Sequence, residues 1–314
     1  MDNKIIVIVG PTAVGKTYVS IELAKRLDAE IVSADSMQIY KGMDIGTAKI
    51  NVSEMQGIKH HMIDIVTPDV NYSVSDFKTD SEKIIDEMHL NSKMPIIVGG
   101  SGLYVNSLIY DLDFGNAKSN KKLRDYYNYY HMEHGQEALY EKLQKIDPEA
   151  AAKIHKNNVK RVIRALEVYD LTGTKFSELN TDIRKPSSKY ECILVGLSMD
   201  RKILYDRINH RVDKMIAQGL IDEVIDLLSK GYHKNLVSMR GIGYKEIIDY
   251  LDGNSNLDEA LNILKRNTRR FAKRQYTWFL RDSNVKWFDI ADADEIDMTI
   301  NDIFEHIKPL ILGG

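Results

Sequence analysis

Cysteine is almost absent from the 314-residue sequence, because Cys192 is the only one. A single cysteine excludes an internal disulfide, and the sequence has no cysteine and histidine spacing typical of a structural zinc site. The one histidine pair, His60-His61, has no cysteine nearby. We therefore interpret this pair as a source of local hydrogen bonds or core packing rather than as a metal site.

Long apolar segments are also missing. The first apolar run, at residues 5–9, is too short for the core of a signal peptide or for a membrane-spanning helix. We therefore expect a cytoplasmic protein with no membrane partner. The composition is 43% hydrophobic and 28% charged, which is ordinary for a globular chain that forms one large or two modest domains.

The net charge of −3 taken alone argues against nucleic-acid binding, but the charges are unevenly distributed. Residues 115–189 carry 15 basic and 10 acidic residues, and residues 265–281 carry seven basic residues and no acidic one. On a helix the second segment would extend over about 25 Å at 1.5 Å per residue. A solvated helix face normally mixes charge signs, so we interpret this segment as a surface for RNA or DNA.

A phosphate-binding loop follows the first apolar run. Residues 10–17 read GPTAVGKT, a complete G-x-x-x-x-G-K-T motif between an expected strand at residues 5–9 and an expected helix at residues 18–27. In such a loop, backbone N–H groups and the helix N-terminus point at one anion. Lys16 adds a positive charge, and the Thr17 hydroxyl can bind Mg²⁺. The residues expected to hold the phosphates are Gly10, Thr12, Ala13, Val14, Gly15, Lys16 and Thr17.

The remaining pattern predicts an α/β fold with a P-loop NTPase-like parallel sheet flanked by helices. Further buried-type strands are expected at residues 30–34, 95–98 and 191–197. Residues 115–188 show no convincing strand, so we expect a helical insertion domain there. The core domain would then consist of residues 1–114 and 189–314, including a basic C-terminal helix.

Two arginines are expected near the phosphates. Residues 200–230 are predicted to be helical, with Arg207 and Arg211 four residues apart on one side. Such a pair often belongs to a solvated face, but here it follows a strand of a phosphate-binding fold. The glycine-rich turn at residues 99–104 allows close approach of the backbone either to a ligand or to the sheet.

Asp35 is the acidic residue best placed near the phosphate loop. Ligands of open parallel sheets bind beyond the carboxyl ends of the strands, so Asp35 and Gln38 should face the same crevice as the loop. Nucleotide-hydrolysing switches and motors need an acidic residue after a later hydrophobic strand. The apolar runs at residues 96–98 and 193–195 instead end in Gly99 and Gly196.

Two chemistries remain open for this loop. In a small-molecule or nucleotide kinase, Asp35 would take the proton of the acceptor or help to hold the metal. Alternatively, the loop grips a diphosphate that leaves, and Lys16, Mg²⁺ and backbone N–H groups stabilise its growing negative charge. A base amine would then attack carbon and lose its proton to Asp35, and Gln38 suits the edge of adenine.

Seven segments of the chain together resemble the bacterial tRNA dimethylallyltransferases, and they occur in the order of that family. They are GPTAVGKT at 10–17, DSMQIY at 35–40, DIGTAK at 44–49, GGSGLY at 99–104, RVIRALE at 161–167, GIGYKE at 241–246 and RQYTW at 274–278. The resemblance implies transfer of a dimethylallyl group from its diphosphate to N6 of the adenosine 3′ of the anticodon, at position 37 of tRNA, with Mg²⁺. It implies that Asp35, Lys16 and Thr17 are catalytic.

The resemblance also implies which residues contact the anticodon stem-loop of tRNA, and we expect the protein to act as a monomer. These residues are Asp35, Ser36, Met37, Gln38, Ser101, Lys160, Arg161, Arg164, Arg240, Gly243, Tyr244, Lys245, Lys273, Arg274, Gln275, Thr277 and Trp278.

Two positions depart from the family pattern. The family usually has Pro-Asn-Asp before its Arg-Val-Ile-Arg helix, whereas this chain has Lys156-Asn157-Asn158. The start of that helix and the role of Asn158 are therefore open. Ser101 stands where threonine is common, which keeps the hydroxyl. The competing hypotheses are the kinase, with the insertion as a lid, and a non-catalytic RNA-binding protein.

Overall fold

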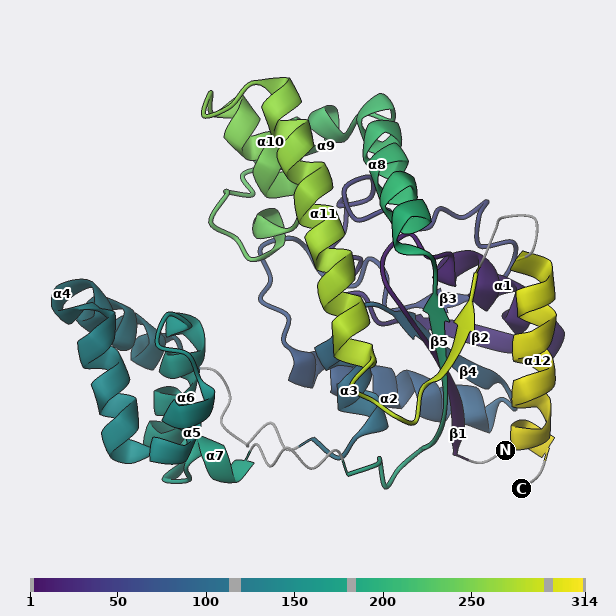
Figure 1. Ribbon diagram of the computed structural model, residues 1–314, viewed down its shortest axis with the longest axis horizontal. Helices are drawn as coiled ribbons and strands as arrows, with labels where there is room; N and C mark the ends of the chain where they lie inside the picture. The colour runs from purple at the N-terminus through teal and green to yellow at the C-terminus, as the bar shows by residue number, and fades with distance from the viewer. Residues whose placement is uncertain (1–2, 113–119, 180–184, 291–295, 313–314) are drawn as a thin grey trace. The chain divides into compact units, whose positions relative to one another are not determined.

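The computed structural model describes residues 3–112, 120–179, 185–290 and 296–312. Contacts divide the chain into two compact units (Figure 1). The larger unit comprises Met1–Ile109 and Ser187–Gly314, and the smaller one is Tyr110–Pro186. The insertion was expected at residues 115–188, and residue 115 lies outside the described residues.

A six-stranded parallel sheet forms the centre of the larger unit, in the order β3-β2-β4-β1-β5-β6 (Figure 1). The strands are β1 (Lys4–Val9), β2 (Ala29–Ser33), β3 (His60–His61), β4 (Met94–Gly99), β5 (Glu191–Ser198) and β6 (Lys286–Asp289). Every residue of β1 is buried, as expected for a central parallel strand. The predicted α/β class is therefore confirmed.

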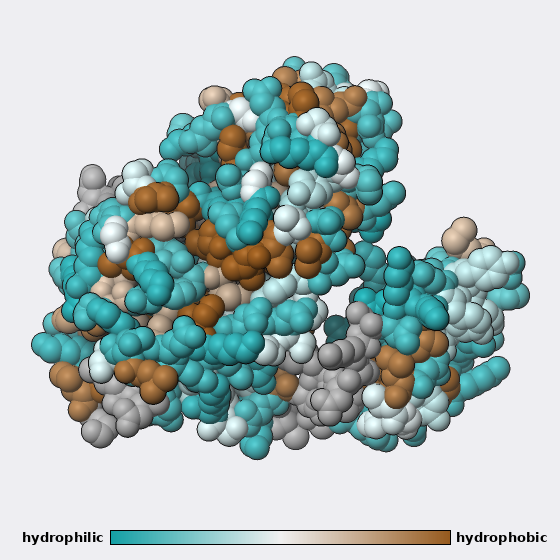
Figure 2. All heavy atoms as spheres, turned by 180° about the vertical axis from the view of Figure 1, so that it is seen from behind, coloured by the Kyte–Doolittle hydropathy of each residue, from teal (hydrophilic) through white to brown (hydrophobic). Residues whose placement is uncertain are grey.

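Helices cover both faces of this sheet. The described helices of the larger unit are α1 (Lys16–Leu27), α2 (Val74–Leu90), α3 (Gly102–Ile109), α8 (Arg201–Ala217), α9 (Leu220–Ser229), α10 (Tyr244–Leu251), α11 (Leu257–Phe279) and α12 (Ile296–Leu312), with a 3₁₀ turn at Ser238–Arg240. On one face, α1 packs against α12, and Ile6 and Ile8 of β1 join their apolar core. The opposite face carries α2 and α3, and α3 contacts α11. Seen from behind, the surface is mostly hydrophilic with scattered hydrophobic groups (Figure 2).

Residues 200–230 are helical, as predicted, but they form two helices. Helix α8 ends at Ala217 and α9 begins at Leu220. Gly219 lies between them with a φ of 97°, a conformation that side chains with a Cβ rarely adopt. Because of this break, α9 runs in a different direction from α8. Glu223 of α9 contacts the loop at residues 44–46.

The smaller unit is helical, as the sequence predicts, apart from a β-bridge between Tyr110 and Pro186. Its helices are α4 (Lys121–Ile146), α5 (Pro148–Lys153), α6 (Val159–Thr172) and α7 (Phe176–Leu179). Helix α6 begins at a proper cap, because the Asn158 side chain accepts a hydrogen bond from the Arg161 N–H at 3.3 Å. The asparagine therefore caps this helix without the proline and acid of the family pattern.

Candidate active site

The phosphate loop leads directly from β1 into α1, as the sequence predicts. Helix α1 has no side-chain cap at its N-terminus, so its first N–H groups remain available to an anion. The Lys16 ammonium instead donates to the carbonyls of Gly10 at 2.9 Å and Pro11 at 2.8 Å. Burial lowers the pKa of Lys16 to about 7, with Asp35 opposing the shift and Arg211 adding to it. The charge of Asp35 thus compensates the positive charge of Lys16 only in part.

Helix α8 brings arginine to the same loop. The Arg211 guanidinium donates to the Thr12 hydroxyl at 3.2 Å. Burial lowers the pKa of Arg211, while Asp35 raises it and Arg207 lowers it further. Two partly buried cations therefore converge on the phosphate loop, which favours a strongly negative ligand there.

A pocket opens where the loop meets the carboxyl ends of β2 and β4. Its polar lining includes Lys16, Thr17, Asp35 and Gln38, which are the residues that the sequence analysis placed in one crevice. Its apolar lining is formed by Ile31, Ile50, Ile63 and Val98. The pocket therefore presents both charged groups and hydrocarbon to a ligand.

Asp35 follows β2 and is held by its own backbone. Its Oδ1 accepts a hydrogen bond from the Met37 N–H at 2.9 Å. Ser101 supports the same segment, since its hydroxyl accepts from the Ser36 N–H at 3.0 Å and donates to the Ser36 hydroxyl at 3.1 Å. These bonds fix the turn that presents the carboxylate to the pocket.

The glycine-rich turn after β4 allows protein segments to come close to one another. A Cβ on Gly100 would lie 2.0 Å from Nε2 of Gln275, and a Cβ on Gly102 would lie 2.4 Å from the Trp278 ring. The Gln275 amide accepts from the Thr12 N–H at 2.8 Å and donates to the Gly100 carbonyl at 3.1 Å. Gln275 was predicted to contact tRNA. It is buried, and it braces the phosphate loop against this turn.

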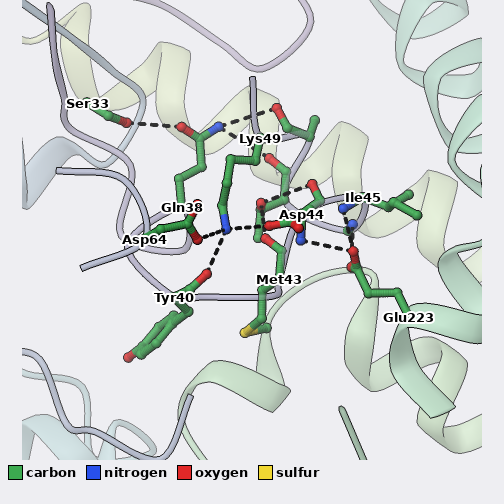
Figure 3. A network of polar contacts seen from close by, with 12 residues as sticks. Ser33, Gln38, Tyr40, Met43, Asp44, Ile45, Lys49, Asp64 and Glu223 are labelled. Atoms are coloured by element: carbon green, nitrogen blue, oxygen red, sulfur yellow. Dashed lines mark hydrogen bonds and ion pairs between the residues drawn. The ribbon is translucent and has the colours of Figure 1, made fainter. Parts of the chain in front are cut away.

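A polar network surrounds Gln38 (Figure 3). The Ser33 hydroxyl donates to the Gln38 carbonyl oxygen at 3.0 Å, and the Gln38 amide N–H₂ group lies 3.4 Å from the carbonyls of Thr47 and Ala48. Glu223 accepts hydrogen bonds from the backbone of residues 44–46. The sequence analysis missed Glu223, because no local signal links it to a loop almost 180 residues earlier in the chain.

Both histidines make hydrogen bonds, as the sequence predicts. His60 Nδ1 lies 2.9 Å from the Ile58 carbonyl oxygen, and His61 Nε2 lies 2.7 Å from a Glu30 carboxylate oxygen. Burial lowers the pKa of His60. Within the described residues, no cluster of three or more histidine, cysteine or carboxylate side chains is arranged to hold a metal ion. A divalent cation would therefore need oxygen atoms from its substrate in addition to those of Thr17 and Asp35.

A family model described as IPP transferase matches residues 38–282. The chain belongs to the IPP transferase family. It is 53% identical over 308 residues to a tRNA dimethylallyltransferase of Alkaliphilus oremlandii, with 98% of each chain covered. The full-length tRNA isopentenylpyrophosphate transferase of Bacillus halodurans matches with a TM-score of 0.74 and 48% identity, covering 98% of this chain and 96% of that one. A eukaryotic dimethylallyltransferase solved acting on tRNA matches with a TM-score of 0.85 and 29% identity, covering 99% and 80%.

The resemblance to the transferases predicts a set of tRNA contacts. In this IPP transferase some of these residues are buried. Tyr244 is fully buried, and its hydroxyl donates to Glu223 at 2.7 Å. Gly243 is also buried, with its N–H bound to Glu246. The structure therefore gives Tyr244 a role in supporting the 44–46 loop, in place of the predicted contact. Arg240 and Lys245 remain exposed beside them.

The basic face of α11 is smaller than predicted. Lys265 pairs with Asp213 at 2.6 Å, and Arg269 donates to Asn209 at 2.6 Å and lies over the Tyr205 ring. These two cations face α8, because residues four apart lie on one side of a helix. The exposed residues of this face are Arg266, Arg270, Lys273, Arg274, Thr277 and the partly exposed Trp278.

The smaller unit carries the other predicted contacts. Lys160 and Arg161 are exposed on α6. Arg164 is partly buried and donates to Glu167 at 2.8 Å, and the same carboxylate accepts from Arg124. Arg164 therefore stabilises this helical unit, whereas Lys160 and Arg161 present their charges at the surface.

Proposed function

We propose that this enzyme transfers a dimethylallyl group from dimethylallyl diphosphate to N6 of adenosine 37 of tRNA, next to the anticodon, and releases diphosphate. The observation that carries the proposal is the pocket in which Lys16, Thr17, Asp35 and Gln38 meet. The tRNA dimethylallyltransferases that cover nearly the whole chain support the choice of reaction. A cytoplasmic location, as expected above, is consistent with a tRNA substrate. We further propose that the protein acts as a monomer.

The cationic side of the pocket suits the leaving diphosphate. Lys16, Arg211 and the N–H groups at the start of α1 lie around the loop, and donors fixed before the reaction stabilise charge that develops as the C–O bond breaks. The isoleucines and Val98 on the other side offer a hydrocarbon surface to the dimethylallyl group.

The other end of the pocket suits the nucleobase. The adenine amine is a weak nucleophile because its lone pair is delocalised into the ring, so a carboxylate that accepts its proton helps it to attack. Asp35 is the carboxylate that lines the pocket. The base must leave its stack to reach this depth, which costs a few kcal/mol and is offset by contacts in the pocket.

Mg²⁺ fits the donor set only in part. The Thr17 hydroxyl and the Asp35 carboxylate both line the pocket, and oxygen ligands are those that Mg²⁺ prefers. When bound, the ion would neutralise negative charge on the diphosphate. Lys16 and Arg211 are the positively charged side chains that the protein itself places at the phosphate loop.

The deciding experiment is an incubation with dimethylallyl diphosphate, Mg²⁺ and unmodified tRNA, analysed by nucleoside mass spectrometry and diphosphate release. We expect prenylated adenosine and diphosphate in equal amounts without ATP. Consumption of ATP with phosphorylation of a small acceptor, and tRNA left unchanged, would instead establish a kinase.

Charge reversal on the exposed face of α11 should weaken tRNA binding. We expect the double variant Arg270→Glu and Lys273→Glu to bind at least tenfold more weakly at low salt. The slope of the logarithm of the tRNA association constant against the logarithm of the salt concentration should become shallower by about two. Each lost phosphate contact reduces the magnitude of this slope by about 0.9. Binding is measured by filter retention at several salt concentrations. The double variant Lys59→Glu and Lys83→Glu is the matched control, since both lysines are exposed elsewhere. An equal effect of the control pair would contradict the assignment.

Binding of the diphosphate donor should take up a proton. Lys16 has a pKa of about 7 and is therefore mostly neutral at pH 8, and an adjacent diphosphate favours its charged form. We expect uptake approaching one proton at pH 8 and much less at pH 6, where Lys16 is already charged. Titration calorimetry in buffers of different ionisation enthalpy measures this number. Lys16→Met should abolish the uptake, and buffer-independent heats for the unmodified protein at pH 8 would refute the prediction.

A further inference from the structure

The amide of Gln38 is held from two sides. Ser33 donates to its Oε1, and its Nε2 faces the carbonyl oxygens of Thr47 and Ala48 (Figure 3). A glutamine amide has two acceptor lone pairs and two N–H donors. The Ser33 contact uses one lone pair of Oε1, and the two carbonyls approach Nε2 only to 3.4 Å. An acceptor and a weakly engaged donor are therefore left for a ligand in the pocket that Gln38 lines.

The carbonyls of residues 47 and 48 decide which way the amide points. The Ser33 hydroxyl can rotate and would donate to oxygen or accept from nitrogen equally well. A flipped amide would place its own oxygen against two carbonyl oxygens, which is repulsive. The position of the 44–49 loop therefore fixes the order of the free acceptor and donor. That order determines which edge of a base Gln38 can recognise.

Glu223 holds this loop in place from α9. Its Oε2 accepts from the N–H groups of Asp44 at 3.0 Å and Ile45 at 2.7 Å (Figure 3). Its Oε1 accepts from the Gly46 N–H at 3.0 Å and from the Tyr244 hydroxyl at 2.7 Å. Bonds to an ionised carboxylate are stronger than those between neutral groups.

Lys49 holds the other end of the loop. Its ammonium is 3% exposed and donates to the Tyr40 carbonyl at 2.7 Å and to the carboxylates of Asp44 and Asp64, each at 2.6 Å. The loop is therefore anchored at both ends around the two carbonyls that face Gln38.

We propose that Ser33 and Glu223 are positioning residues for the Gln38 amide and thereby for the selection of adenine. Ser33 holds the amide in its place, and Glu223 fixes the orientation of the amide through the backbone of the 44–49 loop. The inference rests on the proposed function, because it takes a flipped adenine as the ligand of Gln38. It assigns base selectivity to a side chain on α9 that does not line the pocket.

The experiment measures selectivity with anticodon stem-loop RNAs that carry adenosine, 1-deazaadenosine or 7-deazaadenosine at the target position. Each analogue keeps the attacking amine and lacks one ring nitrogen that can accept from Gln38. The full-length enzyme should prefer adenosine to at least one analogue tenfold or more in kcat/KM. The Gln38→Ala variant lacks the amide. Its ratio of kcat/KM for adenosine to kcat/KM for the analogue should therefore approach one.

The variants are Ser33→Ala and Glu223→Gln. Both should lower the adenosine preference at least fivefold, toward the Gln38→Ala value, while KM for dimethylallyl diphosphate changes less than threefold. Tyr244→Phe removes one of the four donors to Glu223 and should lower the preference in the same direction if Glu223→Gln does not fold. Asp226→Asn is the matched control, since this exposed carboxylate on the same helix binds Lys230.

The outcomes separate this proposal from the proposed function. No prenylated nucleoside from the unmodified enzyme and the adenosine stem-loop means that the proposed function fails. Product without any preference for adenosine overturns the positioning role. The positioning role is also overturned if the folded Ser33→Ala and Glu223→Gln variants keep the full adenosine preference. It is likewise overturned if Asp226→Asn loses as much of this preference as they do.

Discussion

Asp35→Asn should lower kcat by about 10²–10⁴-fold while tRNA binding changes only a few-fold, because general-base catalysis contributes about that much. The asparagine keeps the oxygen that accepts from the Met37 N–H, so the turn after β2 should stay in place. What the variant loses is the ability to take the proton of the adenine amine. The measurement is single-turnover formation of prenylated adenosine, with affinity for tRNA measured separately.

Two further variants sharpen this test. Asp35→Ala removes the turn contact as well and should also nearly abolish turnover, again with tRNA binding within a few-fold. Asp69→Asn neutralises an exposed aspartate in a neighbouring loop and should leave turnover unchanged. Ordinary turnover of Asp35→Asn would remove this carboxylate as the base and would leave a solvent molecule as the proton acceptor.

Lys16→Ala should lower kcat by about 10²–10³-fold, the loss typical when one preorganised donor to developing charge is removed. The ammonium sits inside the phosphate loop, where burial makes its charge costly in the absence of an anion and valuable in its presence. The measurement is the rate of diphosphate release at saturating tRNA, together with KM for dimethylallyl diphosphate. A larger effect on kcat than on KM indicates stabilisation of the leaving group.

The control for this prediction lies on the same helix. Lys25 is exposed, pairs with Glu22 and faces away from the pocket, so Lys25→Ala should leave kcat unchanged. A Lys16→Ala enzyme with nearly normal kcat would show that Arg211 and the backbone N–H groups suffice. Arg211→Ala would then be expected to show the large loss.

The parts of the fold that follow from local pattern were predictable. Four apolar runs gave β1, β2, β4 and β5, and the G-x-x-x-x-G-K-T motif located the loop between β1 and α1. The strand-end rule placed Asp35 and Gln38 beside Lys16 in one pocket, where the structure has them. Each of these inferences needs only residues adjacent in sequence or the general geometry of a parallel sheet.

The parts that depend on distant partners were not predictable. The resemblance to the transferases marked Gln275 for tRNA contact, but the sequence could not show that its amide meets the Thr12 N–H. Tyr244 looked like a contact residue until burial against Glu223 was known. The charges of Lys265 and Arg269 looked free because their partners on α8 are some 50 to 60 residues earlier in the chain. Tertiary packing decides each of these cases.

Gly100 restricts which amino-acid substitutions this enzyme can tolerate. A single methyl group there would collide with the Gln275 amide, and that amide holds the N–H of Thr12. Alanine at residue 100 would therefore deform a catalytic segment nearly ninety positions away without touching it. A substitution at residue 100 is thus a remote change to the phosphate loop, and residues 100 and 275 must vary together. Residue 12 is held through its backbone N–H, so its side chain is not bound by this constraint.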